Sequence, residues 1–193
     1  ANEIVIPAIP VDSNTKNPAI LRIGNPNSSD ATISAKLISK DGNFVPVGLN
    51  NVNVAAERAA NLDIPITQPS NQFGLQITSS KPIVASVFNV ANINGRRDFV
   101  WSTPAENLTD FTLATTGLAP TLVFTGRTIK VNLNLTYTNG RKKSVTISAD
   151  DIATYAAPAN LRSVQFSHIS AGTAGAALIS STSGYGYIPF NAG

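Results

Sequence analysis

The chain has 193 residues, of which 42% are hydrophobic and only 13% are charged, with a formal net charge of +3 and no cysteine. The hydrophobic share is enough for a packed core, which excludes wholesale disorder, and the lack of cysteine excludes disulfides and thiol chemistry. No apolar run approaches the ~20 residues with which a helix spans a bilayer. Because the chain begins at Ala1 and contains no Met, we expect a signal peptide to have been removed and the protein to be extracellular or on the cell surface.

Short segments rich in Val, Ile, Thr and Phe follow one another along the whole chain, separated by turn-forming pairs such as Asp41-Gly42 and Asn139-Gly140. This spacing is typical of an all-β sandwich or barrel. Two Ala-rich segments, 55–60 and 150–155, are the best helix candidates, but each has only one or two turns. The predicted strands, in chain order, are 3–9, 20–24, 31–39, 43–47, 51–55, 61–66, 73–79, 83–90, 98–102, 111–115, 121–124, 128–138, 142–149, 164–169, 176–181 and 185–190.

The clearest predicted element is the hairpin 131–148, in which apolar and polar residues alternate on both sides of an Asn-Gly pair. A two-residue loop would place apolar side chains opposite polar ones, because a shift of one residue moves every side chain to the other face. A three-residue loop with Gly140 in the left-handed region instead pairs Leu133 with Val145 and Val131 with Ile147. We therefore predict the three-residue loop, with one apolar face in the core and one polar face.

Segments 31–47 and 128–148 share the order strand, turn, strand, and each is followed by an Ala-rich patch and a later strand pair. We therefore predict two immunoglobulin-like β-sandwich domains in tandem, 1–103 and 104–193. Chance similarity between two β-rich segments is the alternative interpretation.

Three stretches also carry a resemblance to known proteins: NPNSSDATISAKLISKDG, SSKPIVASVFN and RRDFVWSTPA. Their order resembles secreted bacterial modules, best known from actinobacteria, that form immunoglobulin-like β-sandwiches of unassigned function. The resemblance covers roughly residues 20–105 and is weaker afterwards, where no Lys-Pro precedes the corresponding late strand. It implies secretion and a sandwich fold, and it implies no activity.

Residues able to carry catalysis or hold a metal are few. The single His168 lies in SVQFSHIS on the expected face of Val164 and Phe166, which favours a core or interface position over catalysis. Asp150 and Asp151 are adjacent, so on a strand they point apart, and they look more like helix caps than a pair of catalytic carboxylates. A calcium site at the 41–43 turn lacks the remaining loop ligands. We assign no catalytic, cofactor-binding or metal-binding residue and expect no enzyme.

The sequence also predicts few interaction sites. The basic clusters 96–97 and 141–143 sit at expected turns without interleaved aromatic residues, so we expect no nucleic-acid partner. Trp101 follows Phe99 at a spacing of two and is expected in the core. Three Asn-x-Ser/Thr sequons mark possible glycosylation at Asn27, Asn107 and Asn134.

The N-terminal segment 1–11 is the most informative candidate for a function. Ile4 and Ile6 are in phase, and Ile9 and Val11 are in phase after a shift at Pro7. The segment forms either an ordinary edge strand or a detachable strand that completes the sheet of the next molecule. The C-terminal segment 184–193 is a second candidate for this role.

These features lead to three hypotheses. The first is an exported, non-enzymatic structural protein that assembles with itself into a surface filament or layer by β-strand pairing, with Ile4, Ile6, Ile9 and Val11 at the subunit interface. The alternative is an extracellular carbohydrate- or surface-binding module. A hydrolase that uses His168 is the third.

Overall fold

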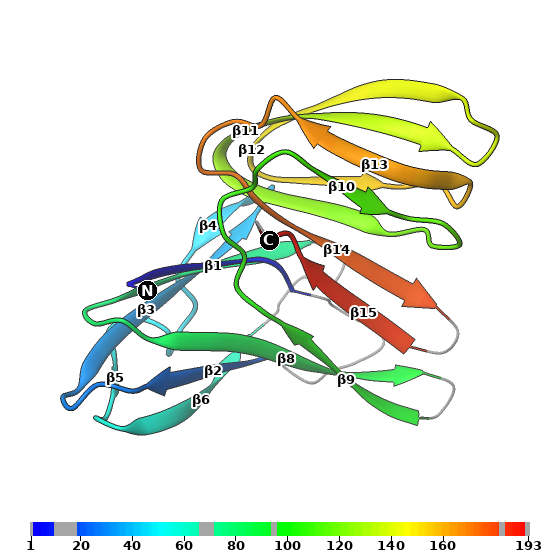
Figure 1. Ribbon diagram of the computed structural model, residues 1–193. Helices are drawn as coiled ribbons and strands as arrows, with labels where there is room; N and C mark the ends of the chain where they lie inside the picture. Colours follow the sequence, from blue (N-terminus) through cyan, green and yellow to red (C-terminus); the bar gives the residue numbers. More distant parts are fainter. Residues whose placement is uncertain (1, 10–18, 66–71, 94–95, 182–183, 192–193) are drawn as a thin grey trace.

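The computed structural model describes residues 2–9, 19–65, 72–93, 96–181 and 184–191, and in these segments the chain forms fifteen strands and no helix. All strand pairs are antiparallel and belong to three sheets. The predicted all-β class is confirmed. In Figure 1 most strands up to Ser102 lie in the lower part, the strands from Phe111 to Ser167 lie at the top, and the last two strands lie between them.

The first nine strands form two sheets that pack face to face. The first sheet has the order β1-β7-β3-β4, with β5 also paired to β3, and the second has the order β6-β2-β8-β9. Their inward residues make one apolar core, to which Ile6 and Leu75 contribute from the first sheet and Leu21 and Val87 from the second. The bounds are β1 (Glu3–Ile9), β2 (Ala19–Asn25), β3 (Ala31–Ser39), β4 (Gly42–Phe44), β5 (Val52–Val54), β6 (Arg58–Ile64), β7 (Phe73–Ser79), β8 (Val84–Ile93) and β9 (Arg96–Ser102).

The remaining six strands form one sheet that bends around a second core. Its order is β10-β13-β11-β14-β15, with β12 paired to the other side of β11. The early half of β11 pairs with β14 and the late half pairs with β13, and the register shifts between Gly126 and Thr128 where the strand bends. Phe124 and Phe166 come from opposite sides of the bend and meet edge to face, with ring centroids 5.9 Å apart. The bounds are β10 (Phe111–Ala114), β11 (Thr121–Tyr137), β12 (Lys142–Ala156), β13 (Leu161–Ser167), β14 (Ala174–Ser181) and β15 (Gly184–Pro189).

The predicted hairpin is confirmed with its register. Leu133 pairs with Val145 and Val131 pairs with Ile147, as expected from the alternation of apolar residues. Gly140 has a φ of 87°, and its amide donates to the Tyr137 carbonyl at 2.9 Å, so the loop contains three residues.

Both helix predictions are wrong. Residues 58–60 belong to β6, and residues 150–155 belong to β12, which continues past the predicted end at 149. The predicted strands 121–124 and 128–138 are likewise one continuous strand, β11, with a bulge at the bend. A helix of one or two turns is marginal on its own, whereas these Ala-rich residues gain cross-strand hydrogen bonds with a neighbouring strand of a sheet. Asp150 and Asp151 are therefore strand residues and not helix caps.

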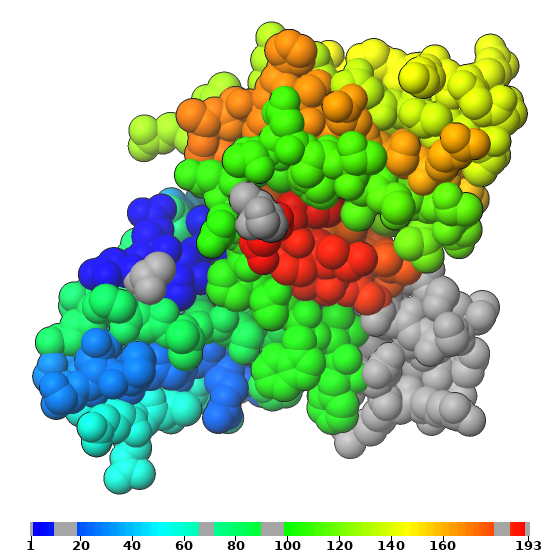
Figure 2. Space-filling view, in the orientation of Figure 1, coloured from blue at the N-terminus to red at the C-terminus, as the bar shows by residue number. Residues whose placement is uncertain are grey.

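The two halves are held together by a small core of their own and by one buried hydrogen bond. Ala8 and Ile38 of the first half pack against Val123, Ile152 and Ala176 of the second. In Figure 2 the red C-terminal residues lie between the two halves, where β15 contacts β9. Separate sheets and separate main cores on either side of residues 103–110 are compatible with the predicted tandem domains.

Candidate functional site

The N-terminal strand lies in its own domain as the edge strand of the first sheet. β1 pairs with β7, and Ile4, Ile6 and Ile9 are all buried in the core. The register shifts between Ile6 and Ile9, which keeps Ile9 in phase after the predicted shift at Pro7. Val11 lies outside the described residues.

The backbone of β1 leaves part of its outer edge without a partner strand. The Ser79 amide donates to the Asn2 carbonyl at 2.8 Å, which makes the facing Glu3 and Thr78 a pair without mutual hydrogen bonds. The amides and carbonyls of Glu3 and Val5 therefore point away from β7. The Val5 carbonyl accepts from the Ala105 amide at 2.9 Å.

Pro7 also belongs to β1, where its lack of a backbone amide is tolerated. It lies in the irregularity of register between Ile6 and Ile9 and has no paired residue on β7, so its missing amide costs the ladder no hydrogen bond. Its carbonyl accepts from the Thr125 hydroxyl of the second half at 3.0 Å, and this bond is buried.

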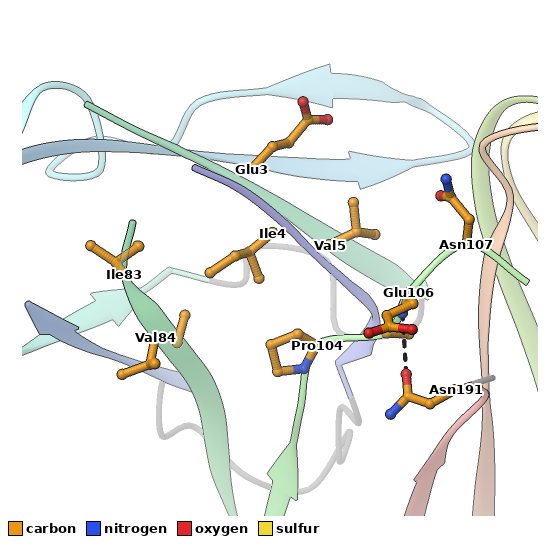
Figure 3. Close-up of a pocket in the computed structure, with 11 residues that line it drawn as sticks. Glu3, Ile4, Val5, Ile83, Val84, Pro104, Glu106, Asn107 and Asn191 are labelled. Carbon is orange, nitrogen blue, oxygen red and sulfur yellow. Dashed lines mark hydrogen bonds between the residues drawn. The ribbon is translucent and has the colours of Figure 1, made fainter. Parts of the chain in front are cut away.

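An open groove of about 760 Å³ runs beside this edge of β1. In Figure 3 Glu3 and Val5 rise on one side of the strand, while Ile4 descends on the other toward Ile83 and Pro104. Apolar residues form the floor of the groove, and the polar residues at its margin come from three distant segments. These polar residues are Glu3, Glu106, Asn107 and Asn191.

Two hydrogen bonds orient residues at the margin of the groove. The Glu106 amide donates to Asn191 Oδ1 at 3.1 Å, as the dashed line in Figure 3 marks. Glu3 accepts from Gln76 Nε2 at 2.6 Å on the outer face of the sheet. An apolar floor next to unpaired strand amides is the arrangement that receives an added β-strand.

A second candidate surface lies on the outer face of the second sheet. Trp101 and Phe88 are directly opposite each other on β9 and β8, with ring centroids 4.9 Å apart. Trp101 is 48% exposed and Phe99 is 59% exposed. We call Phe88, Phe99 and Trp101 the aromatic cluster.

The expectation that Trp101 belongs to the core is therefore wrong. Val100 and Ser102 are the inward residues of β9, so the alternation of the strand places Trp101 outside. The run Phe-Val-Trp is apolar at every position, and only the partner strand decides which of its faces is buried.

His168 is also placed differently from the prediction. It follows the end of β13 with a φ of 49°, which turns its side chain away from the face of Val164 and Phe166, and it is exposed. Its ring nitrogen Nδ1 lies 3.3 Å from the Asn132 amide nitrogen and 3.4 Å from the Ser167 hydroxyl. These contacts include no carboxylate, so they do not form a Ser-His-Asp arrangement.

Two of the three sequon asparagines donate hydrogen bonds through their side-chain amides. Asn27 Nδ2 donates to the Pro82 carbonyl at 2.7 Å, and Asn134 Nδ2 donates to the Ser167 hydroxyl at 3.0 Å. Asn134 nevertheless lies on the polar face of the hairpin, as predicted. Asn107 is exposed at the margin of the groove.

Of the remaining candidates for a metal or catalytic site, Asn43 and Asp151 are in contact. Asn43 Nδ2 donates to Asp151 Oδ1 at 3.2 Å, across the two halves. Within the described segments no group of three or more His, Cys, Asp or Glu side chains is arranged to hold a metal ion. In the same segments no helix has the length and apolar character needed to cross a membrane.

Comparison with known proteins gives a family and partial fold likenesses. A model described as "Family of unknown function (DUF5719)" matches residues 1–159. No curated protein matches the chain. A crystal structure of Thermotoga maritima 1070 is 13% identical and covers 54% of this chain and 92% of its own, with a TM-score of 0.46. The Anabaena sensory rhodopsin transducer is 21% identical and covers 45% of this chain and 94% of its own, with a TM-score of 0.36.

Proposed function

Because the chain belongs to the family of unknown function DUF5719, whose description names no activity, we propose a function from the geometry. The protein is an exported, non-enzymatic structural protein that associates with itself by β-strand pairing and builds a filament or layer at the cell surface. The expectation of export rests on the scarcity of charge and on the resemblance to secreted bacterial modules.

The observation that supports self-association is the groove along β1. Its floor contains Ile4, Ile83 and Pro104, and the adjacent amides of Glu3 and Val5 point out of the sheet. In strand addition, main-chain hydrogen bonds supply affinity and an apolar groove takes alternate side chains of the incoming strand.

Exchange of β1 between copies is the specific route that we propose. β1 is the first strand of the chain, it lies at a sheet edge, and residues 10–18 separate it from β2 in the sequence. In an exchanged assembly, Ile4, Ile6 and Ile9 fill the same positions in the next copy, so the buried contacts are conserved. Repeated head-to-tail exchange does not close on itself and extends into a filament.

A disulfide that fastens β1 to β7 tests this route. Val5 and Gln76 face each other in a pair without mutual hydrogen bonds, where Cα atoms lie about 4.5 Å apart and a disulfide can form. The chain has no native cysteine, so Val5→Cys with Gln76→Cys forms a unique bridge. We expect filaments in electron micrographs and large assemblies in sedimentation profiles under reducing conditions, and neither of them when the chains are oxidised before they assemble.

The matched control is the pair Val5→Ser and Gln76→Ser, which should assemble with or without oxidant. Equal assembly of the oxidised and reduced cysteine variant would reject strand exchange. A wild-type chain that sediments as single molecules under all conditions would reject self-association by β1.

The aromatic cluster favours a second function, binding of carbohydrate or another cell surface. Exposed aromatic rings offer flat apolar faces, and Trp101 and Phe99 present such faces to solvent. We expect Trp101→Ala to abolish binding on a glycan array. Phe44→Ala is the control, because Phe44 is similarly exposed at 43% but lies on the other sheet. An array on which the wild-type chain finds no ligand would contradict this candidate.

A further inference from the structure

The first half of β12 is a long open sheet edge. β12 pairs with β11 on one side, and no other described strand pairs with it on the other. In Figure 1 this yellow strand runs along the outer margin of the upper half. The open part covers residues 142–150 and ends where Asn43 of the first half reaches Asp151. We call it the β12 edge.

The hydrogen bonds of the hairpin decide which β12 residues face outward. The Tyr137 amide donates to the Arg141 carbonyl at 2.8 Å, which makes Thr136 and Lys142 a pair without mutual hydrogen bonds. The amides and carbonyls of alternate residues from Lys142 onward therefore point away from β11. These residues are Lys142, Ser144, Thr146, Ser148 and Asp150.

The residue order of the β12 edge is complementary to itself. When two copies are set antiparallel with Thr146 opposite Thr146, Ser144 faces Ser148 and Val145 faces Ile147. The same register sets Lys142 opposite Asp150 at both ends of the pair. Directly opposite residues share one face of an antiparallel sheet, so the polar residues of the outward set meet polar ones and Val145 meets Ile147, whereas Lys143 faces Ala149 on the second face.

We propose that the β12 edge is an interface that binds a second copy of this chain, in the antiparallel register centred on Thr146. The outward amides and carbonyls then pair across a two-fold axis, and the bent sheets of the two copies become one continuous sheet. Lysines near an open edge normally discourage pairing with other strands. Here each Lys142 gains a carboxylate partner only in this register, so the same charge selects the correct alignment.

This interface is separate from the proposed exchange of β1. The β12 edge belongs to the second half and β1 belongs to the first, so either contact forms without the other. A closed two-fold contact by itself gives a dimer, whereas the exchange of β1 gives an open chain.

A single cysteine on the two-fold axis tests the register. Thr146 is exposed and faces its own copy as a hydrogen-bonded pair, for which Cα atoms lie about 5.5 Å apart, within reach of a disulfide. Thr146→Cys should form a disulfide dimer under mild oxidation. Ser148→Cys is the control on the same edge, because its counterpart lies about 13 Å away along the partner strand and should stay unlinked. Equal cross-linking of both variants, or of neither, would overturn the register.

A charge exchange tests the interface in solution. Lys142→Glu sets like charges opposite each other at both ends of the pair, and we expect the dimer to weaken roughly tenfold in sedimentation equilibrium. Lys142→Glu combined with Asp150→Lys restores opposite charges and should restore the dimer. Circular dichroism checks that each variant keeps its strand content. Identical dissociation constants for the wild type and both variants would overturn the proposal.

The same measurement on the oxidised Val5→Cys, Gln76→Cys chain separates this inference from the exchange of β1. A dimer that persists there requires no exchanged strand. A chain that is a single molecule there at about 100 μM, yet assembles after reduction, refutes the β12 interface and leaves the exchange of β1 in place.

Discussion

The hydrogen bond from Thr125 to the Pro7 carbonyl supports the sharpest prediction about stability. Thr125 is 3% exposed, and its hydroxyl lies 3.0 Å from the Pro7 carbonyl. Thr125→Val keeps the shape of the side chain and removes the donor. Pro7 is buried as well, so its carbonyl has no water to replace the lost partner.

The size of the effect follows from these two facts. Leaving a buried acceptor without its partner costs about 1–3 kcal/mol, and the added methyl of valine returns less than about 1 kcal/mol. We expect the free energy of unfolding to fall by about 1–2 kcal/mol. In a chain of this length that lowers the melting temperature by about 2–8 °C.

Urea unfolding followed by circular dichroism and by fluorescence of the single Trp101 measures this change. Thr116→Val is the matched control, because the Thr116 hydroxyl is exposed and lies 3.4 Å from the Arg162 carbonyl. The control should unfold within about 0.5 kcal/mol of the wild type. The reasoning is refuted if Thr125→Val also unfolds within that margin.

Three further changes test other parts of the structure. Asn25→Ala removes a side chain that donates to the carbonyls of Ser29, Val54 and Ala55, so urea unfolding should show a loss of about 2–3 kcal/mol, and a loss below about 1 kcal/mol would contradict this role. Gly74→Ala places a methyl 2.9 Å from the Thr125 hydroxyl and 3.1 Å from the Pro7 carbonyl, and calorimetry should show a stability loss of about 1–3 kcal/mol, whereas an unchanged melting temperature would mean that these neighbours yield. Burial raises the pKa of Tyr187 above its ordinary value of 10.0, so the folded chain holds this proton where the unfolded chain releases it, and stability falls as the pH rises above about 10. Tyr187→Phe should reduce this loss of stability at alkaline pH. The substitution also removes the 2.7 Å hydrogen bond to the Thr103 carbonyl, so the variant is less stable at neutral pH. If stability falls with pH equally steeply in both proteins, Tyr187 is not the cause of the alkaline loss.

Local alternation predicted the parts of the fold in which one face of a strand is apolar. The hairpin around Gly140 was predictable residue by residue, because only one loop length keeps Val131 and Leu133 opposite apolar partners. The same reasoning placed Ile4 and Ile6 on the buried face of β1. In the run 99–101 the residues of both faces are apolar, so the sequence does not indicate which face is buried.

The candidate sites depended on contacts between distant residues. The groove joins β1 to residues 104–107 and to Asn191, and no spacing along the chain marks these segments as neighbours. His168 does not lie on the face that alternation predicts, because its own backbone is in the left-handed region just after the end of β13. The apolar-polar pattern of the sequence gives no sign of that conformation.

The all-β class and the register of the best hairpin were predictable from the order of the residues, because period-two patterning and turn residues act over a few neighbouring positions. Tertiary structure alone decided that the Ala-rich segments are strands and that Trp101 faces solvent. It also decided that β1 rests in its own sheet beside an open groove. Each of these outcomes depends on which partner strand supplies hydrogen bonds and covers a face, and that partner comes from elsewhere in the chain.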